Sequence, residues 1–302
     1  MIHRIHKQLK DFTPYTYHSV IMSIISPRSY SYVVNRLRNF FLKRGFLEVH
    51  TQNRLSILAA CEDPTTISTF FYLNNKWPLP QTGQMWLEWE MLNDPRPAGY
   101  FCVSTSYRQE PRPIPGRHEM IFPMFEFEQH GGVEELRQME CELLRYLGYG
   151  TEHQLIFNES NYSTVASAYE TKDVTSDHEN RLYTDHGSVF FLRNFPEYTS
   201  PFWNMARNED GTAKKIDVIL SGQETIGSAE RCCDKDEMRH RFNTISGGEY
   251  SRLLYNTFGK DRVDKELNDF LRLPFIRRSG GGIGLTRLIR SLSMEGLMPK
   301  QS

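Results

Sequence analysis

Hydrophobic residues recur along the chain at two spacings, and each spacing predicts a different kind of element. Between Ser29 and Arg44, apolar residues return every three or four positions, which is typical of an amphipathic helix. Its buried face would carry Val33, Leu37, Phe40 and Phe41. The segment Gly131–Gly150 predicts a second such helix, with a buried side formed by Leu136, Met139, Leu143 and Leu147. A third helix is expected to begin at Leu285.

Shorter runs with strand-like composition lie between these helices. Tyr100–Tyr107 is rich in β-branched, aromatic and small residues, and Phe122–Glu128 alternates phenylalanines with Met124 and Glu126, the pattern of a half-buried strand. Because a loop rich in proline and glycine joins these two runs, they predict an antiparallel hairpin. Further strands are expected at Phe46–Val49, Val189–Leu192 and Ile216–Leu220. Residues 53–80 show no regular pattern, and residues 157–185 are polar.

Composition is that of a globular protein without membrane spans. Hydrophobic residues make up 39% and charged residues 24% of the 302 positions. No run reaches the roughly 18 apolar residues of a span, and the N-terminus lacks a secretory signal, so a cytoplasmic location is expected. The five cysteines have neither metal-binding spacing nor a disulfide framework, and we expect reduced thiols. A net charge of -1 and a pI near 6.8 give no sign of a nucleic-acid-binding surface.

Charged residues gather at the mouth of the predicted hairpin. Arg108 and Glu110 follow its first strand, and Arg117, His118 and Phe122 lead into its second. Taken singly, such charges are usually loop residues, and a single phenylalanine is usually core. Their order, Arg-x-Glu, loop, Arg-His-x-x-x-Phe, resembles motif 2 of the class II aminoacyl-tRNA synthetases. The resemblance implies that Arg108 holds the α-phosphate of ATP and the amino-acid carboxylate. It also implies that Glu110 and Phe122 bind adenine, and that Arg117 and His118 reach the outer phosphates.

The first predicted helix and the residues after it resemble motif 1 of the same family. The helix of residues 29–44 leads through Gly45–Val49 to Thr51, and in the family this element forms the dimer interface. A homodimer is therefore implied, although Gln52 stands where the family has proline. The family fold is of the α+β class, an antiparallel sheet flanked by helices. Residues 1–28 are polar and aromatic and contain Pro14 and Pro27, so they predict an N-terminal arm, and the resemblance implies a single catalytic domain of residues 29–302.

The glycine-rich run Arg277–Arg287 resembles motif 3. Its Gly282 and Gly284 would let the backbone approach a bound nucleotide closely. The helix that begins at Leu285 would offer its N-terminus to anions, and the resemblance places Arg287 at the outer phosphates of ATP. A glycine-rich turn alone is a weak signal, but three motifs in the family's order are a strong one.

The segment Thr82–Glu88 resembles the Ser-Gly-Gln-Leu-Tyr-Leu-Glu segment of asparaginyl-tRNA synthetases. Aspartyl enzymes place a lysine where this chain has Leu87, so we expect Glu88 to be free to accept hydrogen bonds from a side-chain amide. The resemblance also implies that Gln84 contacts the amino acid and that Glu62 binds its α-ammonium group.

The run from Ile216 to Arg231 resembles the family segment that holds the metal and the substrate side chain. The resemblance implies that Asp217 and Glu224 bind Mg²⁺ and that Arg231 binds the side-chain oxygen, although the family's metal-side serine falls on Ala229. Activation of an amino acid by ATP depends on positioning and charge neutralisation rather than on a protein nucleophile. Arg108 and Arg287 are therefore the expected catalytic cations, with ATP and Mg²⁺ as cofactors.

The acceptor of the activated amino acid is less defined. Asparaginyl-type enzymes carry an N-terminal barrel of about 100 residues for the anticodon. Only residues 1–28 precede the motif 1 helix and the net charge is near zero, so tRNA is not expected as a partner. Gly280–Gly284 and Phe125–Glu128 resemble the synthetase-like asparagine synthetases, which lack the barrel. The leading interpretation is an ATP-dependent ligase that joins aspartate to ammonia or a small amine. The alternatives are asparagine activation to another amide or a nitrile, a stand-alone asparaginyl-tRNA synthetase, and a non-catalytic sensor.

Overall fold

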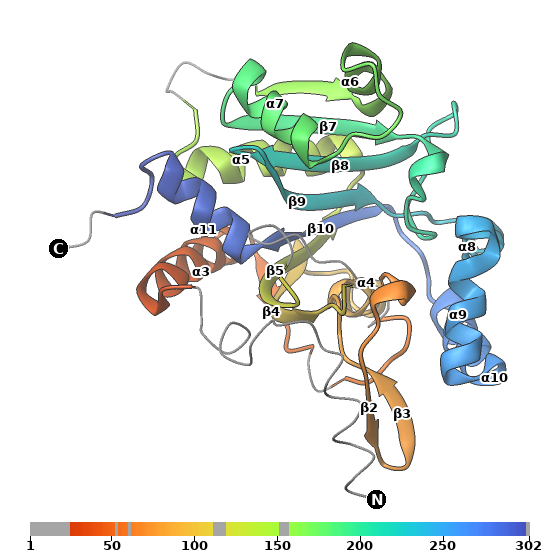
Figure 1. Ribbon diagram of the computed structural model, residues 1–302. Helices are drawn as coiled ribbons and strands as arrows, with labels where there is room; N and C mark the ends of the chain where they lie inside the picture. The colour runs from red at the N-terminus through yellow and green to blue at the C-terminus, as the bar shows by residue number, and fades with distance from the viewer. Residues whose placement is uncertain (1–24, 52–53, 60–61, 111–118, 151–156, 300–302) are drawn as a thin grey trace, which may run out of the picture.

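The computed structural model describes residues 25–299 except 52–53, 60–61, 111–118 and 151–156. Within these residues, eight strands form one mixed sheet in the order β1-β4-β5-β10-β9-β8-β7-β6 (Figure 1). The edge pairs β1–β4 and β6–β7 are parallel, and the pairs between them are antiparallel. The mainly antiparallel sheet expected from the sequence is confirmed. Its strands are β1 (Phe46–Glu48), β4 (Gly99–Tyr107), β5 (Ile121–His130), β6 (Asn158–Asn161), β7 (Val189–Phe195), β8 (Ala213–Leu220), β9 (Gln223–Glu230) and β10 (Arg278–Gly284).

Helices flank the sheet in three groups (Figure 1). The first group packs on one face and consists of α3 (Pro27–Leu42), α5 (Val133–Leu147) and α11 (Leu285–Met294). The second packs on β7 and β8 and consists of α6 (Tyr162–Ala168) and α7 (Ser176–His186). The third shares another apolar cluster and consists of α4 (Gln84–Asn93), α8 (Lys235–Thr244), α9 (Glu249–Phe258) and α10 (Lys260–Leu271). Short 3₁₀ turns lie at Pro64–Thr66, Glu197–Thr199 and Ile245–Gly248.

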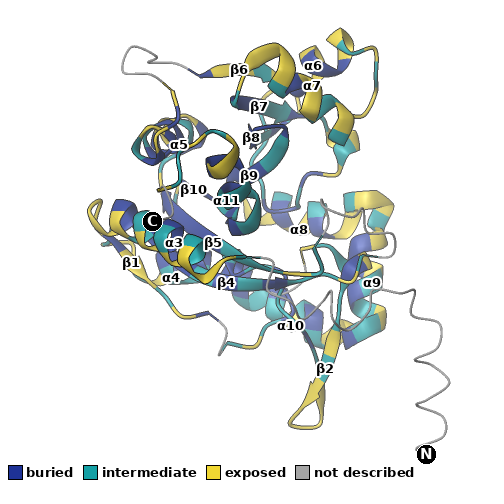
Figure 2. Cartoon of the chain, turned by 60° about the vertical axis from the view of Figure 1, so that its left-hand side comes forward, coloured by how far each residue is buried: buried dark blue, intermediate teal, exposed yellow. Residues whose placement is uncertain are grey.

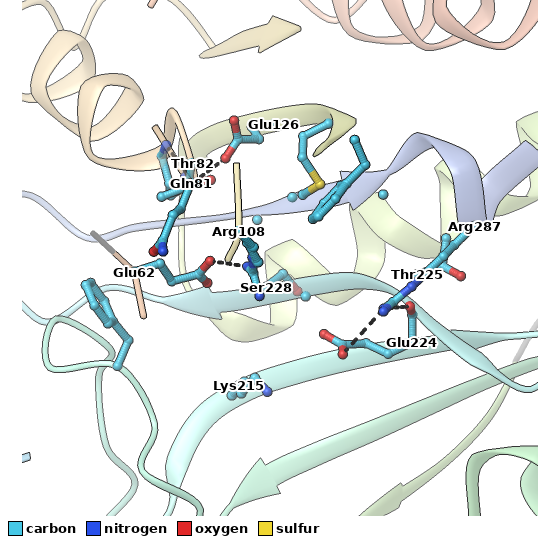
Figure 3. Close-up of a pocket in the computed structure, with 18 of the residues that line it drawn as sticks. Glu62, Gln81, Thr82, Arg108, Glu126, Lys215, Glu224, Thr225, Ser228 and Arg287 are labelled. Carbon is cyan, nitrogen blue, oxygen red and sulfur yellow. Dashed lines mark hydrogen bonds and ion pairs between the residues drawn. The ribbon is translucent and has the colours of Figure 1, made fainter. Parts of the chain in front are cut away.

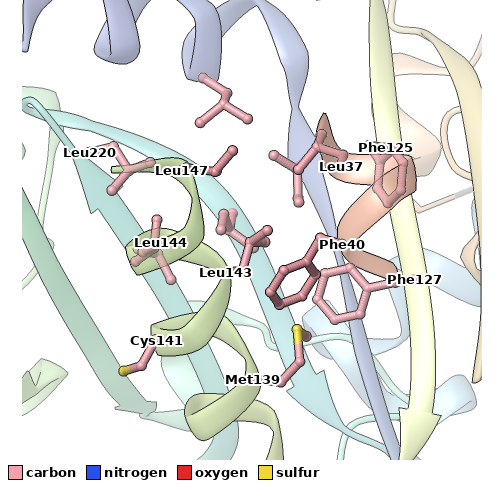
Figure 4. Close-up of a cluster of buried hydrophobic side chains, with 14 of the residues drawn as sticks. Leu37, Phe40, Phe125, Phe127, Met139, Cys141, Leu143, Leu144, Leu147 and Leu220 are labelled. Carbon is pink, nitrogen blue, oxygen red and sulfur yellow. The ribbon is translucent and has the colours of Figure 1, made fainter. Parts of the chain in front are cut away.

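The apolar stripes of α3, α5 and α11 meet in a single cluster on one face of the sheet (Figure 4). In this cluster the ring centroid of Phe41 lies 5.1 Å from that of Phe125 and 5.2 Å from that of Phe127. Leu143 and Leu147 of α5 are buried in the same cluster. Burial of side chains of this size contributes about 1.5–3 kcal/mol each. The cluster therefore fixes α3 and α5 behind β5 and leaves the other face of β5 for polar side chains.

The alternating pattern of β5 is confirmed, but its polar face does not meet solvent. Phe125 and Phe127 face the apolar cluster as predicted, whereas Glu126 and Glu128 on the opposite face are 1% and 0% exposed. Helix α4 packs on that face of β4 and β5 and covers the two carboxylates. Figure 2 shows how deeply the central strands lie between the helices. The prediction of a half-buried strand was wrong because the sequence pattern does not reveal what covers a polar face.

The predicted helices at residues 29–44, 131–150 and from 285 are confirmed as α3, α5 and α11, and the predicted hairpin as β4 and β5. Residues 53–80, which show no regular pattern in the sequence, contain a hairpin of β2 (Thr69–Tyr72) and β3 (Asn75–Pro78). Its turn residues Leu73 and Asn74 have φ of 50° and 59°, as tight two-residue turns require. The polar segment 157–185 forms β6, α6 and α7.

No helix among the described residues is long and apolar enough to cross a membrane. Cys102, Cys141, Cys232 and Cys233 are free thiols, as expected, and Cys61 lies outside the described residues. The predicted arm of residues 1–28 also lies largely outside them, because the described chain begins at Ile25 and α3 begins at Pro27.

Candidate active site

A cavity of about 410 Å³ opens over β5, β9 and β10, on the sheet face opposite α3 and α5 (Figure 3). Asp217 lies beside the cavity, and Arg117 and His118 lie outside the described residues. The other sequence-predicted site residues all line it: Glu62, Gln84, Glu88, Arg108, Glu110, Phe122, Glu224, Arg231, Gly282, Gly284 and Arg287. The fold thus brings together residues that lie as far apart in the sequence as positions 62 and 287.

The glycines of β10 serve two different purposes. A Cβ atom on Gly280 would lie 2.2 Å from the carbonyl oxygen of Phe127, and one on Gly281 would lie 2.5 Å from that of Gly227. These two glycines are required for the strands to pack. At Gly284 no atom lies closer than 3.8 Å to the Cβ position, and at Gly282 the closest is the flexible end of Met124 at 2.6 Å. The cavity floor is therefore open at Gly284, whereas the end of Met124 lies over Gly282, and the approach of a nucleotide to this backbone stays a prediction.

Arg108 stands at the end of β4, in the middle of the cavity wall. Its Nη2 donates to Glu62 Oε2 at 2.6 Å, and its guanidinium carbon lies 5.9 Å from the centre of the Phe122 ring. Its Nε is buried and has no hydrogen-bond partner. The carboxylates of Glu62, Glu224 and Glu110 raise the pKa of Arg108, with Glu62 first. A permanently charged group with an unused donor is suited to bind an anionic oxygen.

One end of the cavity holds Arg287 and Glu224. Arg287 Nη1 donates to the Glu224 carbonyl oxygen at 2.6 Å and lies 3.9 Å from Glu224 Oε2. Arg287 comes from the first turn of α11, and the Glu224 backbone nitrogen donates to Glu179 of α7. The pair therefore combines a cation with a carboxylate at the end where the sequence places the phosphates.

Asp217 and Glu224, the predicted Mg²⁺ ligands, direct one oxygen each toward the same open space. A Cβ atom on Gly227 would lie 3.0 Å from Glu224 Oε1 and 3.7 Å from Asp217 Oδ1, so both oxygens border the space that this glycine leaves open. Asp217 Oδ1 is buried without a partner, while Oδ2 accepts a hydrogen bond from Lys215 at 2.7 Å. Burial raises the pKa of Asp217, and Lys215 opposes the rise. The described residues hold no cluster of three or more metal-binding side chains, but Mg²⁺ commonly takes one or two carboxylates and obtains its other ligands from phosphate and water.

The other end of the cavity is a buried network of two carboxylates and two guanidinium groups. Arg231 Nε lies 3.4 Å from Glu128 Oε2 and 3.6 Å from Glu88 Oε1. Gln84 Nε2 donates to Glu128 Oε2 at 2.5 Å, which leaves Gln84 Oε1 buried and unpaired. Gln84 thus keeps a polar atom available, and its contact with the amino acid stays a prediction.

Glu88 is not free, contrary to the prediction. Its Oε2 accepts from Arg278 Nη2 at 2.5 Å, and its Oε1 accepts from Asn204 Nδ2 at 2.7 Å. Glu88 and Arg278 are both 0% exposed. The missing lysine at Leu87 does not leave Glu88 without a cation, because Arg278 supplies one from β10. Glu88 therefore supports Arg231 rather than offering a bare carboxylate.

Two glutamates that the sequence did not single out organise this end of the site. Burial and the nearby Glu88 together raise the pKa of Glu128 to about 7, although Arg231 and Arg278 lower it. Glu126 accepts hydrogen bonds from the Gly83 nitrogen at 2.8 Å and from the hydroxyls of Thr82 and Ser104. It thereby anchors the residues that begin α4, the helix that carries Gln84 and Glu88. The alternation of β5 placed both glutamates on one face and could have identified them.

Comparisons with known proteins agree with this architecture. The sequence model for tRNA synthetases class II (D, K and N) matches residues 17–296. No curated protein sequence gives a significant match. Asparaginyl-tRNA synthetase from Pyrococcus horikoshii, complexed with asparaginyl-adenylate, superposes with a TM-score of 0.71 and 19% identity, over 91% of this chain and 65% of that one. The asparaginyl-tRNA synthetase of Entamoeba histolytica, also with asparaginyl-adenylate, gives 0.70 and 16% identity over 94% and 72%. A putative aspartyl-tRNA synthetase from Leishmania major Friedlin gives 0.68 and 18% identity over 87% and 61%.

These identities are low, so the structural matches establish the fold, and this chain spans less than two thirds of the Pyrococcus horikoshii enzyme. The family match covers most of the sequence. The chain belongs to the class II tRNA synthetase family of the D, K and N group.

Proposed function

We propose that the protein is an ATP-dependent, AMP-forming ligase that activates aspartate or asparagine and transfers it to ammonia or a small amine. The observation that carries the proposal is the position of Arg108. Its unpaired Nε lies in a cavity with the Arg287–Glu224 pair at one end and the Arg231–Glu128 pair at the other. A cation between a phosphate-binding end and an amino-acid-binding end is placed where the two substrates would react.

The proposed activation step uses these residues for binding and neutralisation. ATP binds with adenine against Phe122 and Glu110, its α-phosphate at Arg108 and its outer phosphates at Arg287. Arg117 and His118 are assigned to the outer phosphates by resemblance alone. A carboxylate oxygen of the amino acid attacks the α-phosphorus, and pyrophosphate leaves. Mg²⁺, held by Asp217 and Glu224, would neutralise phosphate charge. Fixed cations in a water-poor cavity stabilise developing charge at little reorganisation cost.

The amino acid binds at the other end of the cavity in this proposal. Glu62 takes the α-ammonium group, and the Nη atoms of Arg231 take a side-chain oxygen. The unpaired Gln84 Oε1 and Asn204 Oδ1 are acceptors that suit ammonium or amide hydrogens. In the amide-forming version, ammonia attacks the activated carbonyl carbon, loses a proton and displaces AMP.

A second candidate is charging of tRNA by a stand-alone asparaginyl-tRNA synthetase. The two solved asparaginyl enzymes described above, each with asparaginyl-adenylate, favour it. The net charge of -1 favours a small acceptor instead, because proteins that bind nucleic acid through phosphate contacts usually carry a basic surface.

One set of incubations separates these candidates. The protein is mixed with ATP and Mg²⁺ and with aspartate, aspartate plus ammonium, or asparagine, and AMP and products are measured by mass spectrometry. AMP and asparagine that require both aspartate and ammonium support the ligase, and AMP from aspartate without ammonium dependence contradicts it. AMP from asparagine alone identifies asparagine activation. A product with the mass of asparagine minus one water would indicate a nitrile. Labelling of total tRNA by radioactive asparagine supports the synthetase. Tight ligand binding in calorimetry without any AMP would indicate a sensor.

We also propose a homodimer built on the motif 1 elements. Leu42 at the end of α3 and Leu47 of the edge strand β1 are each 50% exposed, and Gln52 lies outside the described residues. Light scattering after size-exclusion chromatography tests this assignment. A monomer at micromolar concentration contradicts it.

A further inference from the structure

Lys215 of β8 faces the cavity but has no part in the chemistry above. Its Nζ lies 2.7 Å from Asp217 Oδ2 and 4.0 Å from the centre of the Phe195 ring, which restrains the side chain. The side chain of Lys215 is 22% exposed and that of Asp217 is 9% exposed. The ion pair is therefore largely removed from water. Opposite charges attract more strongly in such a place than they do in water.

Asp217 divides its two oxygens between the lysine and the candidate metal position. Oδ2 accepts from Lys215, whereas Oδ1 has no partner and borders the same open space over Gly227 as Glu224 Oε1. Lys215 and Asp217 cancel each other, and Arg287 lies 3.9 Å from Glu224. Each of the two carboxylates is therefore already next to a cation.

We propose that Lys215 is an internal counterion that prevents the Asp217–Glu224 pair from holding a divalent cation until a nucleotide polyphosphate arrives with it. The inference rests on the proposed use of a nucleotide, but not on which amino acid or acceptor is used. A free divalent cation meets two carboxylates that each already lie beside a cation, and two carboxylates supply few of its ligands. A polyphosphate adds both ligands and negative charge, so cation and nucleotide bind together.

The test measures the affinity of the full-length protein for Mn²⁺, used in place of Mg²⁺, without nucleotide. Free Mn²⁺ gives an electron paramagnetic resonance signal, and this signal decreases when Mn²⁺ binds. Lys215→Met should bind Mn²⁺ at least tenfold more tightly than the wild type, and Lys215→Arg should behave like the wild type. Lys214→Met is the matched control. Its side chain points to the other face of β8, with Nζ 3.2 Å from Glu230 Oε1, so its Mn²⁺ affinity should equal that of the wild type.

Several results would overturn the proposal. Equal Mn²⁺ affinity in the wild type and in Lys215→Met would contradict it. Tight binding of Mn²⁺ to the wild type without nucleotide would also contradict it. Adding Asp217→Asn to Lys215→Met should abolish the gain in Mn²⁺ affinity. A gain that persists would contradict the placement of the cation at Asp217. If circular dichroism shows that Lys215→Met does not fold, Lys215→Gln makes the same comparison. Failure of the proposed function looks different, because no AMP would form with any substrate while the Mn²⁺ results stay as described.

Discussion

Two hollows in the described part of the chain contain arginines, and they differ in whether buried polar atoms are left without partners. The second hollow, near α8, has a volume of about 640 Å³, against about 410 Å³ for the candidate active site. Arg207 and Arg241 both donate to the carbonyl oxygen of Met205, and each pairs with a glutamate that is also in the hollow, Glu197 and Glu237. By volume alone, the second hollow would be the better anion site.

The candidate active site contains unpaired buried atoms, and the second hollow does not. Arg108 Nε, Gln84 Oε1 and Asn204 Oδ1 are buried without partners, whereas no described residue that lines the second hollow contributes such an atom. An unsatisfied buried polar group costs about 1–3 kcal/mol. Such groups persist where a ligand supplies the missing partner. Unpaired atoms within a cavity therefore mark the candidate site better than cavity size.

The largest effect is expected from removing the central unpaired donor. Arg108→Ala should lower the rate of AMP formation by about 10³-fold, because a fixed cation at developing charge contributes on this scale. Circular dichroism should be unchanged, since Arg108 is at a strand end and its side-chain partner, Glu62, is 47% exposed. Quench-flow or steady-state assays of AMP release measure the effect. Turnover at the wild-type rate would show that the motif 2 assignment is wrong.

The buried pairs of the active site should also matter more for stability than the exposed pairs of the second hollow. Arg278→Met removes the closer of the two cations beside the fully buried Glu88 and should lower the free energy of unfolding by about 3–5 kcal/mol. Urea denaturation measures this change. The double variant Glu88→Gln/Arg278→Met should recover part of the loss. A single variant as stable as the wild type would contradict the buried network.

Arg231→Ala should act on one substrate only. The amino-acid KM should rise by about 10- to 100-fold, as expected for loss of a charge-assisted hydrogen bond, while the KM for ATP changes little. Initial-rate measurements with each substrate varied in turn make the test. Equal effects on both constants would remove Arg231 from the side-chain role.

Glu140 sharpens the comparison because it has unpaired buried oxygens but lines neither hollow. Burial raises its pKa from 4.5 to about 8, so at neutral pH it is protonated in the folded chain and ionised in the unfolded one. Between these two pKa values the folded state binds one proton more than the unfolded state. The free energy of unfolding therefore falls as pH rises, by at most about 1.4 kcal/mol per pH unit. Glu140→Gln should flatten the fall of Tm between pH 6 and 8. The control Glu142→Gln, which alters a partly exposed partner of Arg44, should leave this fall of Tm unchanged. Parallel curves of Tm against pH for Glu140→Gln and the wild type would refute the assignment to Glu140.

The smallest effect is expected in the second hollow. Arg241→Gln should change AMP formation by less than about twofold and the free energy of unfolding by less than about 1 kcal/mol, because its glutamate partner is 42% exposed. The same assays measure both quantities. A loss of activity comparable to that of Arg108→Ala would mean that paired arginines can mark a ligand site here, and the comparison between the hollows would fail.

Local patterns predicted the parts of this molecule that depend on neighbours in sequence. The spacing of Leu37 and Phe41 predicts α3, and the run around Arg108 predicts the hairpin and the centre of the candidate site. The amino-acid end depends on contacts that sequence spacing does not encode. Arg278 reaches Glu88 across 190 positions, and an arginine in the run 277–287 looks the same whether it is buried or exposed. Helices α8–α10 were not predicted, because they are short and charged and acquire their apolar surroundings from α4 and from each other.

The position of β10 has a consequence for how the chain matures during synthesis. Residues 278–284 form the strand that joins β1, β4 and β5 on one side to β6–β9 on the other. A ribosome releases the partner strands well before this one, so the two half-sheets can form early but cannot be joined until β10 emerges. The bare glycine floor and Arg287 arrive in the same stretch of chain. We therefore expect a nascent chain to be unable to bind nucleotide until nearly all the residues described here have been made, which would keep incomplete copies from consuming ATP.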